Sequence, residues 1–174
     1  MKELTILLIA VIVFGIFFNK IKQNLNLTSV ESTVDGREYT VRKLPDKLDA
    51  ANKLAEINKS LTKLVKFVYE DKNKDTDKVK GILQLYTKFD PNNLTENTPG
   101  GKYTAYSVNK GEQLALCLRN VPDNTFIDNN TIYFVAIHEL AHIMTDEIGH
   151  TPKFWSNMKY LLEVGEKIGI KFNI

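Results

Sequence analysis

The sequence predicts a small α+β domain, in which a short and mostly antiparallel sheet packs on helices, behind an N-terminal transmembrane helix. Three observations lead to this fold class. An uncharged apolar run occupies residues 4–18 at the amino terminus. Short alternating segments are interspersed with amphipathic helical ones, which is the pattern of an α+β domain. About 145 residues then remain beyond the apolar run and its linker, enough for a single core.

The apolar run is the first element. If Lys20 extends its charge toward the surface, the span reaches Ile21 and approaches the minimum of about 17 residues for crossing a bilayer. A cleaved signal peptide is the alternative, but the segment that follows offers no small-residue cleavage site and places positive charge there. We therefore expect an uncleaved membrane anchor over residues 1–23, a polar linker over 24–36 and one domain over 37–174. The lysines that flank the anchor favour the cytoplasmic side for the domain.

The other elements before position 120 are short strands and amphipathic helices separated by turns. In chain order they are a strand over residues 37–44, helices over 46–69 and 75–89, a loop over 91–101, and strands over 103–108 and 112–119. The last two strands form a hairpin. On the second helix, we expect Val79, Ile82, Leu83 and Tyr86 to face the core.

The most informative segment is a helix predicted over residues 131–144, which contains His138, Glu139 and His142 in the pattern H-E-x-x-H. Two histidines four positions apart project from one face of a helix, so both imidazoles can bind one metal ion. A carboxylate beside the first ligand can deprotonate a water whose pKa zinc lowers to about 7. Histidines buried in a core are the alternative, but all three histidines of the chain lie between positions 138 and 150. The pattern therefore predicts a zinc site with Glu139 as general base.

A catalytic zinc site needs a third protein ligand and an open fourth position. His150 lies between the motif helix and Thr151 and Pro152, which can start another helix that runs to about residue 167. A histidine at this junction can fold back toward the first two. A glutamate of the following helix, Glu163 or Glu166, is the alternative third ligand.

These segments together resemble the WLM (Wss1-like) and SprT-like zinc metallopeptidases. The resemblance covers residues 103–162. It depends on the strand segment 114–120, on the H-E-L-A-H motif, and on the run from Gly149 to Trp155, in which a third histidine precedes Phe and Trp.

The resemblance implies a zincin-like domain with an active-site helix and a protein or peptide substrate. It assigns one zinc ion to His138, His142 and His150, and the general base to Glu139. In such peptidases an extended substrate pairs with an edge strand, for which residues 112–119 are our candidate. We therefore expect a membrane-anchored zinc metalloendopeptidase.

Two other functions stay open. A catalytically silent structural protein of a membrane or envelope could use the same zinc only to hold the loop with His150 in place. Some members of the resembled families digest proteins crosslinked to DNA, so a crosslink-repair peptidase is the other alternative. The net charge of +2 and the lack of a sustained basic stretch argue against a nucleic-acid partner. The single cysteine, Cys117, excludes an internal disulfide and a cysteine-based zinc site.

Overall fold

The structure, a computed structural model, describes residue 5 and residues 26–72, 75–98, 105–108, 113–121 and 123–171. It has an α+β fold with a five-stranded sheet. The strands are β1 (Leu27–Glu31), β2 (Glu38–Arg42), β3 (Leu94–Glu96), β4 (Ala105–Val108) and β5 (Gln113–Leu116). The helices are α2 (Lys47–Glu70), α3 (Val79–Lys88), α4 (Asn129–Met144) and α5 (Pro152–Lys167), with short 3₁₀ helices η1 (Thr76–Lys78) and η2 (Pro91–Asn93).

The sheet is mixed, so the prediction of a mostly antiparallel sheet is wrong. The strand order is β1-β2-β3-β5-β4, with antiparallel pairs at both ends and two parallel pairs in the middle. Helices α2 and α3 connect β2 to β3, and such a crossover lets the two strands run parallel. Strand β3 lies in the segment predicted as a loop, because three residues are too few to show an alternating pattern.

The strand that was predicted to form the edge of the sheet is not an edge strand. Strand β5, within residues 112–119, lies between β3 and β4. Among the described residues, β4 is therefore the outermost strand on this side of the sheet. A hairpin alone does not reveal which of its two strands has a further neighbour, and the short β3 supplied that neighbour.

Part of the predicted linker over residues 24–36 is strand β1. It pairs antiparallel with β2, from Leu27 opposite Arg42 to Glu31 opposite Glu38. The strand is mostly polar and half exposed, so it lacks the regular apolar face by which a strand is recognised in sequence. Strand β1, which lies before residue 37, is therefore part of the same sheet as the later strands.

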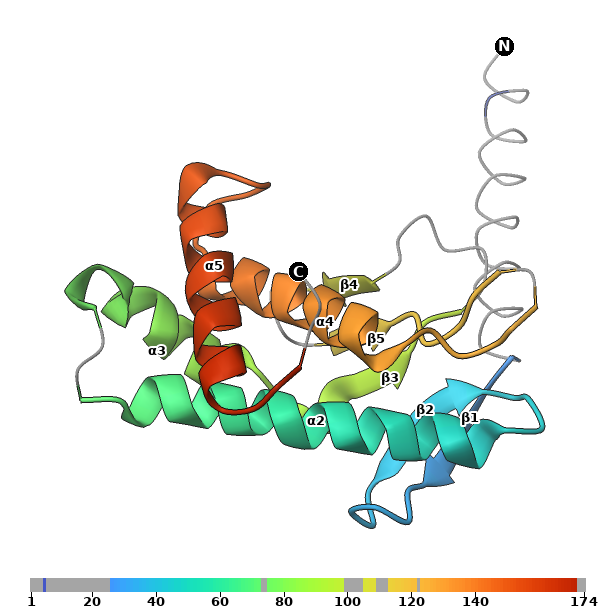
Figure 1. Cartoon of the computed structure of the whole chain (residues 1–174). Coiled ribbons are helices and arrows are strands. Elements are labelled where there is room, and N and C mark those ends of the chain that lie inside the picture. The colour runs from blue at the N-terminus through green and yellow to red at the C-terminus, as the bar shows by residue number, and fades with distance from the viewer. Residues whose placement is uncertain are drawn as a thin grey trace.

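The core lies between the sheet and the four helices. Helix α2 runs along the length of the domain, with α4 beside it and α5 crossing α4 toward α2 (Figure 1). The buried stripe of α2 follows helical spacing, as predicted. Its fully buried apolar members include Ala51, Leu54, Ile57, Leu61, Leu64 and Val68.

Helix α3 buries only part of the face that was predicted to be inward. The side chains that it exposes are Val79, Leu83 and Tyr86. Ile82 is buried as predicted, and Leu85 is buried as well. The reason is a close approach at Gly81, where a Cβ atom would lie 2.7 Å from the carbonyl oxygen of Met144. The backbone of α3 thus packs directly on the end of α4.

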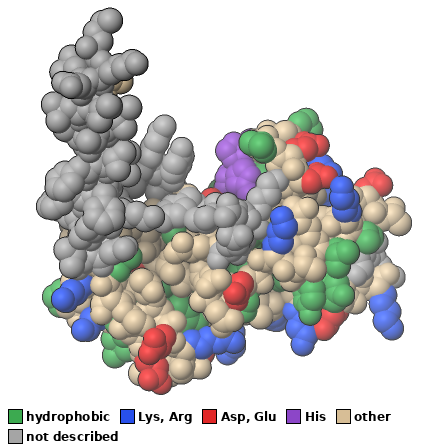
Figure 2. Space-filling model, turned by 180° about the vertical axis from the view of Figure 1, so that it is seen from behind, with side chains coloured by type: hydrophobic (Ala, Val, Ile, Leu, Met, Phe, Trp, Pro, Cys, Tyr) green, Lys and Arg blue, Asp and Glu red, His purple; other side chains and the backbone are tan. Residues whose placement is uncertain are grey.

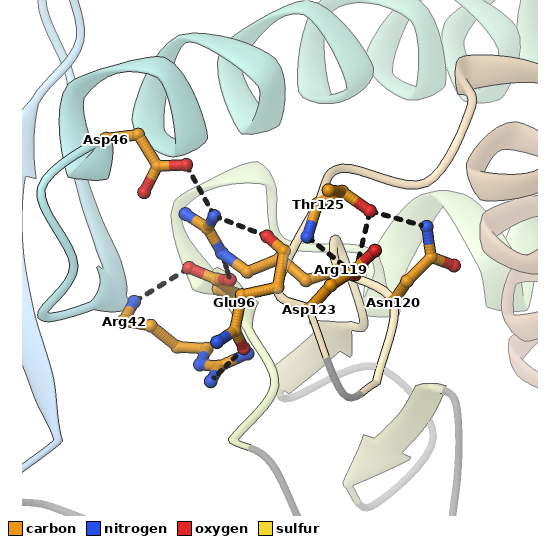
Figure 3. A network of polar contacts seen from close by, with 8 residues as sticks. Arg42, Asp46, Glu96, Arg119, Asn120, Asp123 and Thr125 are labelled. Atoms are coloured by element: carbon orange, nitrogen blue, oxygen red, sulfur yellow. Dashed lines mark hydrogen bonds and ion pairs between the residues drawn. The ribbon is translucent and has the colours of Figure 1, made fainter.

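A buried ion pair joins the sheet to the start of α2. Arg119 Nε donates a hydrogen bond to Glu96 Oε1 at 2.8 Å, and the two side chains are 1% and 0% exposed. Arg119 also donates to Asp46, at the N-cap of α2, at 2.6 Å. Its guanidinium lies 4.3 Å from the ring centroid of Phe126. Figure 3 shows Arg119 between the two carboxylates, with the backbone nitrogen of Arg42 donating to the other oxygen of Glu96.

The predicted anchor, residues 1–23, lies outside the described residues except for residue 5. In the part of the chain that the structure describes, no helix is both long enough and apolar enough to cross a membrane. The anchor and the side of the membrane on which the domain lies stay predictions.

Candidate metal centre

Helix α4 presents the H-E-x-x-H motif near the surface. At its start, the backbone nitrogen of Thr131 donates a hydrogen bond of 3.0 Å to the carboxylate of Asp128, which is a standard N-cap. Apolar side chains on the rest of the helix are buried in the core. His138 and His142 are half-buried and lie one turn apart.

The connection between α4 and α5 brings His150 back toward the motif. Helix α4 ends at Met144, and Gly149 takes a φ of +85°, a conformation that glycine adopts without strain. Thr151 then caps α5 as predicted, because its Oγ1 accepts a hydrogen bond from the backbone nitrogen of Phe154 at 3.3 Å. The exposed His150 therefore lies between two helix ends that are each well defined.

Three hydrogen bonds hold this connection in place. Asp146 accepts hydrogen bonds from Lys153 Nζ at 2.7 Å and from Lys80 Nζ at 3.1 Å, so it links the connection to α5 and α3. These lysines hold the pKa of the Asp146 carboxyl well below its usual range. In the core, Asn157 Nδ2 donates to Thr145 Oγ1 at 3.0 Å. The position of His150 is thus supported by residues from three helices.

The three imidazoles converge. One ring nitrogen of each of His138, His142 and His150 lies within 4.8 Å of the others. The Nε2 atoms of His138 and His150 are 3.1 Å apart. Two nitrogens bound to one tetrahedral zinc at about 2.05 Å would be about 3.3 Å apart, so the separation of His138 and His150 fits this metal. Figure 2 shows the histidines gathered in one patch at the surface.

The environment of His138 suits metal binding. Burial lowers the pKa of its imidazole, and the nearby charge of His150 lowers that pKa further. A lower pKa keeps more of the side chain neutral, which is the form that binds a metal ion. Glu139 follows directly on α4, and its side chain is largely buried, with 8% exposed.

The alternative third ligands lie elsewhere. Among the described residues, the group that could hold a metal ion consists of the three histidines and includes neither Glu163 nor Glu166. Both glutamates line a pocket on the side of α5 instead. The geometry therefore favours His150 over a glutamate.

Phe154 and Trp155 lie against the histidines, a placement that the sequence analysis did not predict. Phe154 is fully buried beneath the histidines, with ring centroids 4.9, 4.3 and 4.7 Å from those of His138, His142 and His150. Trp155 is 53% exposed, and its ring centroid is 5.6 Å from that of His150. The sequence signal was the pair of adjacent aromatic residues in the first turn of α5, since neighbouring positions of a helix point in different directions.

Comparisons with known sequences identify a family and several relatives. The family model described as WLM domain matches residues 39–172. Uncharacterized protein R325 of Acanthamoeba polyphaga mimivirus is 36% identical over 171 residues, which cover 98% of this chain and 85% of that protein. Uncharacterized protein 136R of Invertebrate iridescent virus 6 is 37% identical over 68 residues, or 38% of either chain.

Solved structures show a similar fold. The crystal structure of Wss1 from Saccharomyces cerevisiae has a TM-score of 0.57 and 25% identity, and the similarity covers 74% of this chain and 86% of that one. A mutant of Wss1 from the same organism has a TM-score of 0.56 and 24% identity, with 75% and 92% covered. Because the family match extends from β2 to beyond α5, this chain belongs to the WLM domain family.

Proposed function

We propose that this chain is a zinc metallopeptidase of the H-E-x-x-H type, which hydrolyses peptide bonds of a protein substrate. The observation that carries the proposal is the convergence of His138, His142 and His150. Three protein ligands leave one coordination position open, as in catalytic rather than structural zinc sites. Membership of the WLM domain family and the likeness to Wss1 support the same activity.

Glu139 would move the proton in this reaction. Zinc, when bound by the three histidines, supplies a Lewis acid that polarises a carbonyl oxygen and lowers the pKa of water. The Glu139 carboxylate would accept the proton of the attacking water and then donate it to the nitrogen of the leaving amine. Its place beside His138 on the rigid helix α4 suits this role, because a proton carrier must stay within hydrogen-bond reach of both partners.

The substrate would bind as an added strand. Among the described residues, β4 is the outermost strand of the sheet on its side, and it packs against α4. An extended peptide that pairs with the backbone of β4 would run beside the histidines. The strand proposed to pair with the substrate is therefore β4, residues 105–108, and not the segment 112–119.

The test is hydrolysis of casein by the full-length chain, followed by gel electrophoresis and mass spectrometry. Glu139→Gln is expected to keep one zinc per chain and to lose activity by about 100-fold or more, because it removes a general base. Glu56→Gln, the same change at an exposed position of α2, is the matched control and should cleave normally. Full activity of Glu139→Gln would refute the assigned role.

The two alternative functions predict other results in this assay. A catalytically silent protein that uses zinc as a staple would bind zinc but leave casein intact in every variant. A crosslink-repair peptidase would be stimulated by DNA, so the assay is repeated with single-stranded DNA. The modest net charge of +2 favours activity without DNA.

Anchoring in a membrane is part of the same proposal. It depends on the apolar run over residues 4–18, and the domain is proposed to lie on the cytoplasmic side. Carbonate extraction of membranes from expressing cells tests it. Release of the full-length chain into the supernatant would contradict the anchor without affecting the peptidase.

A further inference from the structure

A pocket of about 320 Å³ lies between α4 and α5. Its apolar walls are Phe134 from α4 and Trp155, Met158 and Leu162 from α5. Its charged lining residues are Lys159, Glu163 and Glu166. Ligand pockets in proteins range from about 300 to 1,000 Å³, so this one is small and suits one or two side chains.

The pocket adjoins the candidate metal centre. Phe134 precedes His138 by one helical turn on α4, so the two side chains lie on the same side of that helix. On the other wall, the ring of Trp155 lies next to the ring of His150. A molecule that occupies the pocket would therefore be close to anything bound at the histidines.

The lining indicates what the pocket can take. Four apolar side chains favour an apolar guest, and a half-exposed tryptophan offers a large rigid contact surface. Two glutamates and one lysine give the charged lining a net charge of −1, and Lys159 lies 3.8 Å from Glu163. An acidic guest would be repelled and would lose its hydration against apolar walls.

We propose that this pocket receives a large apolar side chain of the substrate, such as Leu, Met or Phe, one or two residues from the scissile bond. The spacing supports this distance, because residues of an extended peptide are about 3.3 Å apart and one wall of the pocket contacts His150. The inference rests on the proposed peptidase function and adds a specificity to it. Leu162, Phe134 and Trp155 are then specificity-determining residues.

The test uses the full-length chain, a mixed peptide library and mass spectrometry of the cleavage sites. At one substrate position near the cleaved bond, kcat/KM for Leu, Met or Phe is expected to exceed that for Ala or Asp by about tenfold or more. Leu162→Trp fills the pocket and should lower the ratio of kcat/KM for the large residues to that for Ala by about tenfold. The matched control is Leu83→Trp, at an exposed leucine of α3 outside the pocket, and its cleavage profile should equal that of the wild type.

Failure of this inference is distinguishable from failure of the peptidase proposal. Cleavage without an apolar preference, or a profile that Leu162→Trp leaves unchanged, would overturn the pocket while the peptidase stands. If no peptide is cleaved, the fluorescence of Trp155, the single tryptophan of the chain, tests whether the pocket binds an apolar side chain. A blocked Ala-Ala-Leu-Ala-Ala peptide should then change this fluorescence at about tenfold lower concentration than blocked penta-alanine, and equal responses would overturn the pocket.

Discussion

His138 and His150 approach to 3.1 Å between their Nε2 atoms, although one lies in the middle of α4 and the other beyond its end. In a neutral pair without a metal ion, this contact would require one ring to donate and the other to accept. A shared metal ion removes that requirement, because it binds the lone pair of each nitrogen. The contact therefore makes His150 a specific candidate for the third ligand.

His150→Ala is predicted to abolish stable zinc binding. The wild-type chain should contain about one zinc, and loss of one of three protein ligands should lower this well below one half. Plasma mass spectrometry of the purified full-length chain measures the ratio. Ile148→Ala, in the same connection and highly exposed, is the control and should keep its zinc. Undiminished zinc in a folded His150→Ala variant would return Glu163 and Glu166 to consideration.

Gly81→Ala is predicted to destabilise the domain by about 1–3 kcal/mol, as overpacking does. In an ordinary helix this change stabilises by about 1 kcal/mol, so the sign itself is the test. The new Cβ would lie 2.7 Å from the carbonyl oxygen of Met144 and 3.1 Å from its Cγ, and the backbone atom cannot move without displacing the end of α4.

Urea unfolding measures the effect of Gly81→Ala, with Val79→Ala on the exposed side of the same helix as the control. The control should change the free energy of unfolding by less than about 1 kcal/mol. An increase in stability for Gly81→Ala would show that α3 and α4 are further apart than described here.

Local patterns predicted the helices well and the sheet poorly, for a physical reason. The stripe of α2 and the Thr151 cap of α5 depend on residues within a few positions of each other, so both appear in the sequence. The order of the strands depends on contacts between distant segments. Strand β3 pairs with β2 and β5 through only three residues, and that pairing is not encoded in any local repeat.

The sequence likewise predicted only part of the candidate metal centre. The spacing of His138 and His142 is a property of one helix, so the motif predicted their proximity. The sequence did not decide whether His150 lies near His138 and His142. Its position depends on the contact between Asp146 and Lys80, which belongs to a helix more than sixty positions earlier. The close approach of Gly81 to α4 likewise has no sequence signal, because a glycine within a helix ordinarily indicates only a low helix propensity.

Glu96→Gln is predicted to destabilise the domain by about 3–5 kcal/mol, because it leaves the charge of Arg119 buried without its fully buried partner. Arg119 and Glu96 are both almost completely inaccessible. Asp46→Asn removes the other, partly exposed partner of Arg119 and should cost about 1 kcal/mol or less. Urea unfolding at neutral pH ranks the two variants, and equal losses would contradict the role given to burial.

Tyr39 is predicted to make the stability of the domain sensitive to alkaline pH. Its hydroxyl donates a hydrogen bond to Asp35 at 2.7 Å and accepts one from Asn58 at 2.8 Å, and the residue is 2% exposed. Burial raises the pKa of Tyr39 from 10.0 to about 12. Because the folded pKa exceeds the unfolded one, this stabilisation is complete below pH 10 and is lost as the pH rises to about 12.

Tyr39→Phe should therefore lower the free energy of unfolding by about 1–3 kcal/mol at neutral pH, because Asp35 and Asn58 lose a partner. The difference between variant and wild type should shrink between pH 10 and about 12, where the wild type alone loses the contribution of its buried phenol. Tyr86→Phe, at an exposed tyrosine, controls for the ionisation of the other tyrosines and lysines. Urea unfolding across this pH range gives the comparison. A difference that stays constant from pH 8 to about 12 would mean that Tyr39 ionises alike in the folded and unfolded chains.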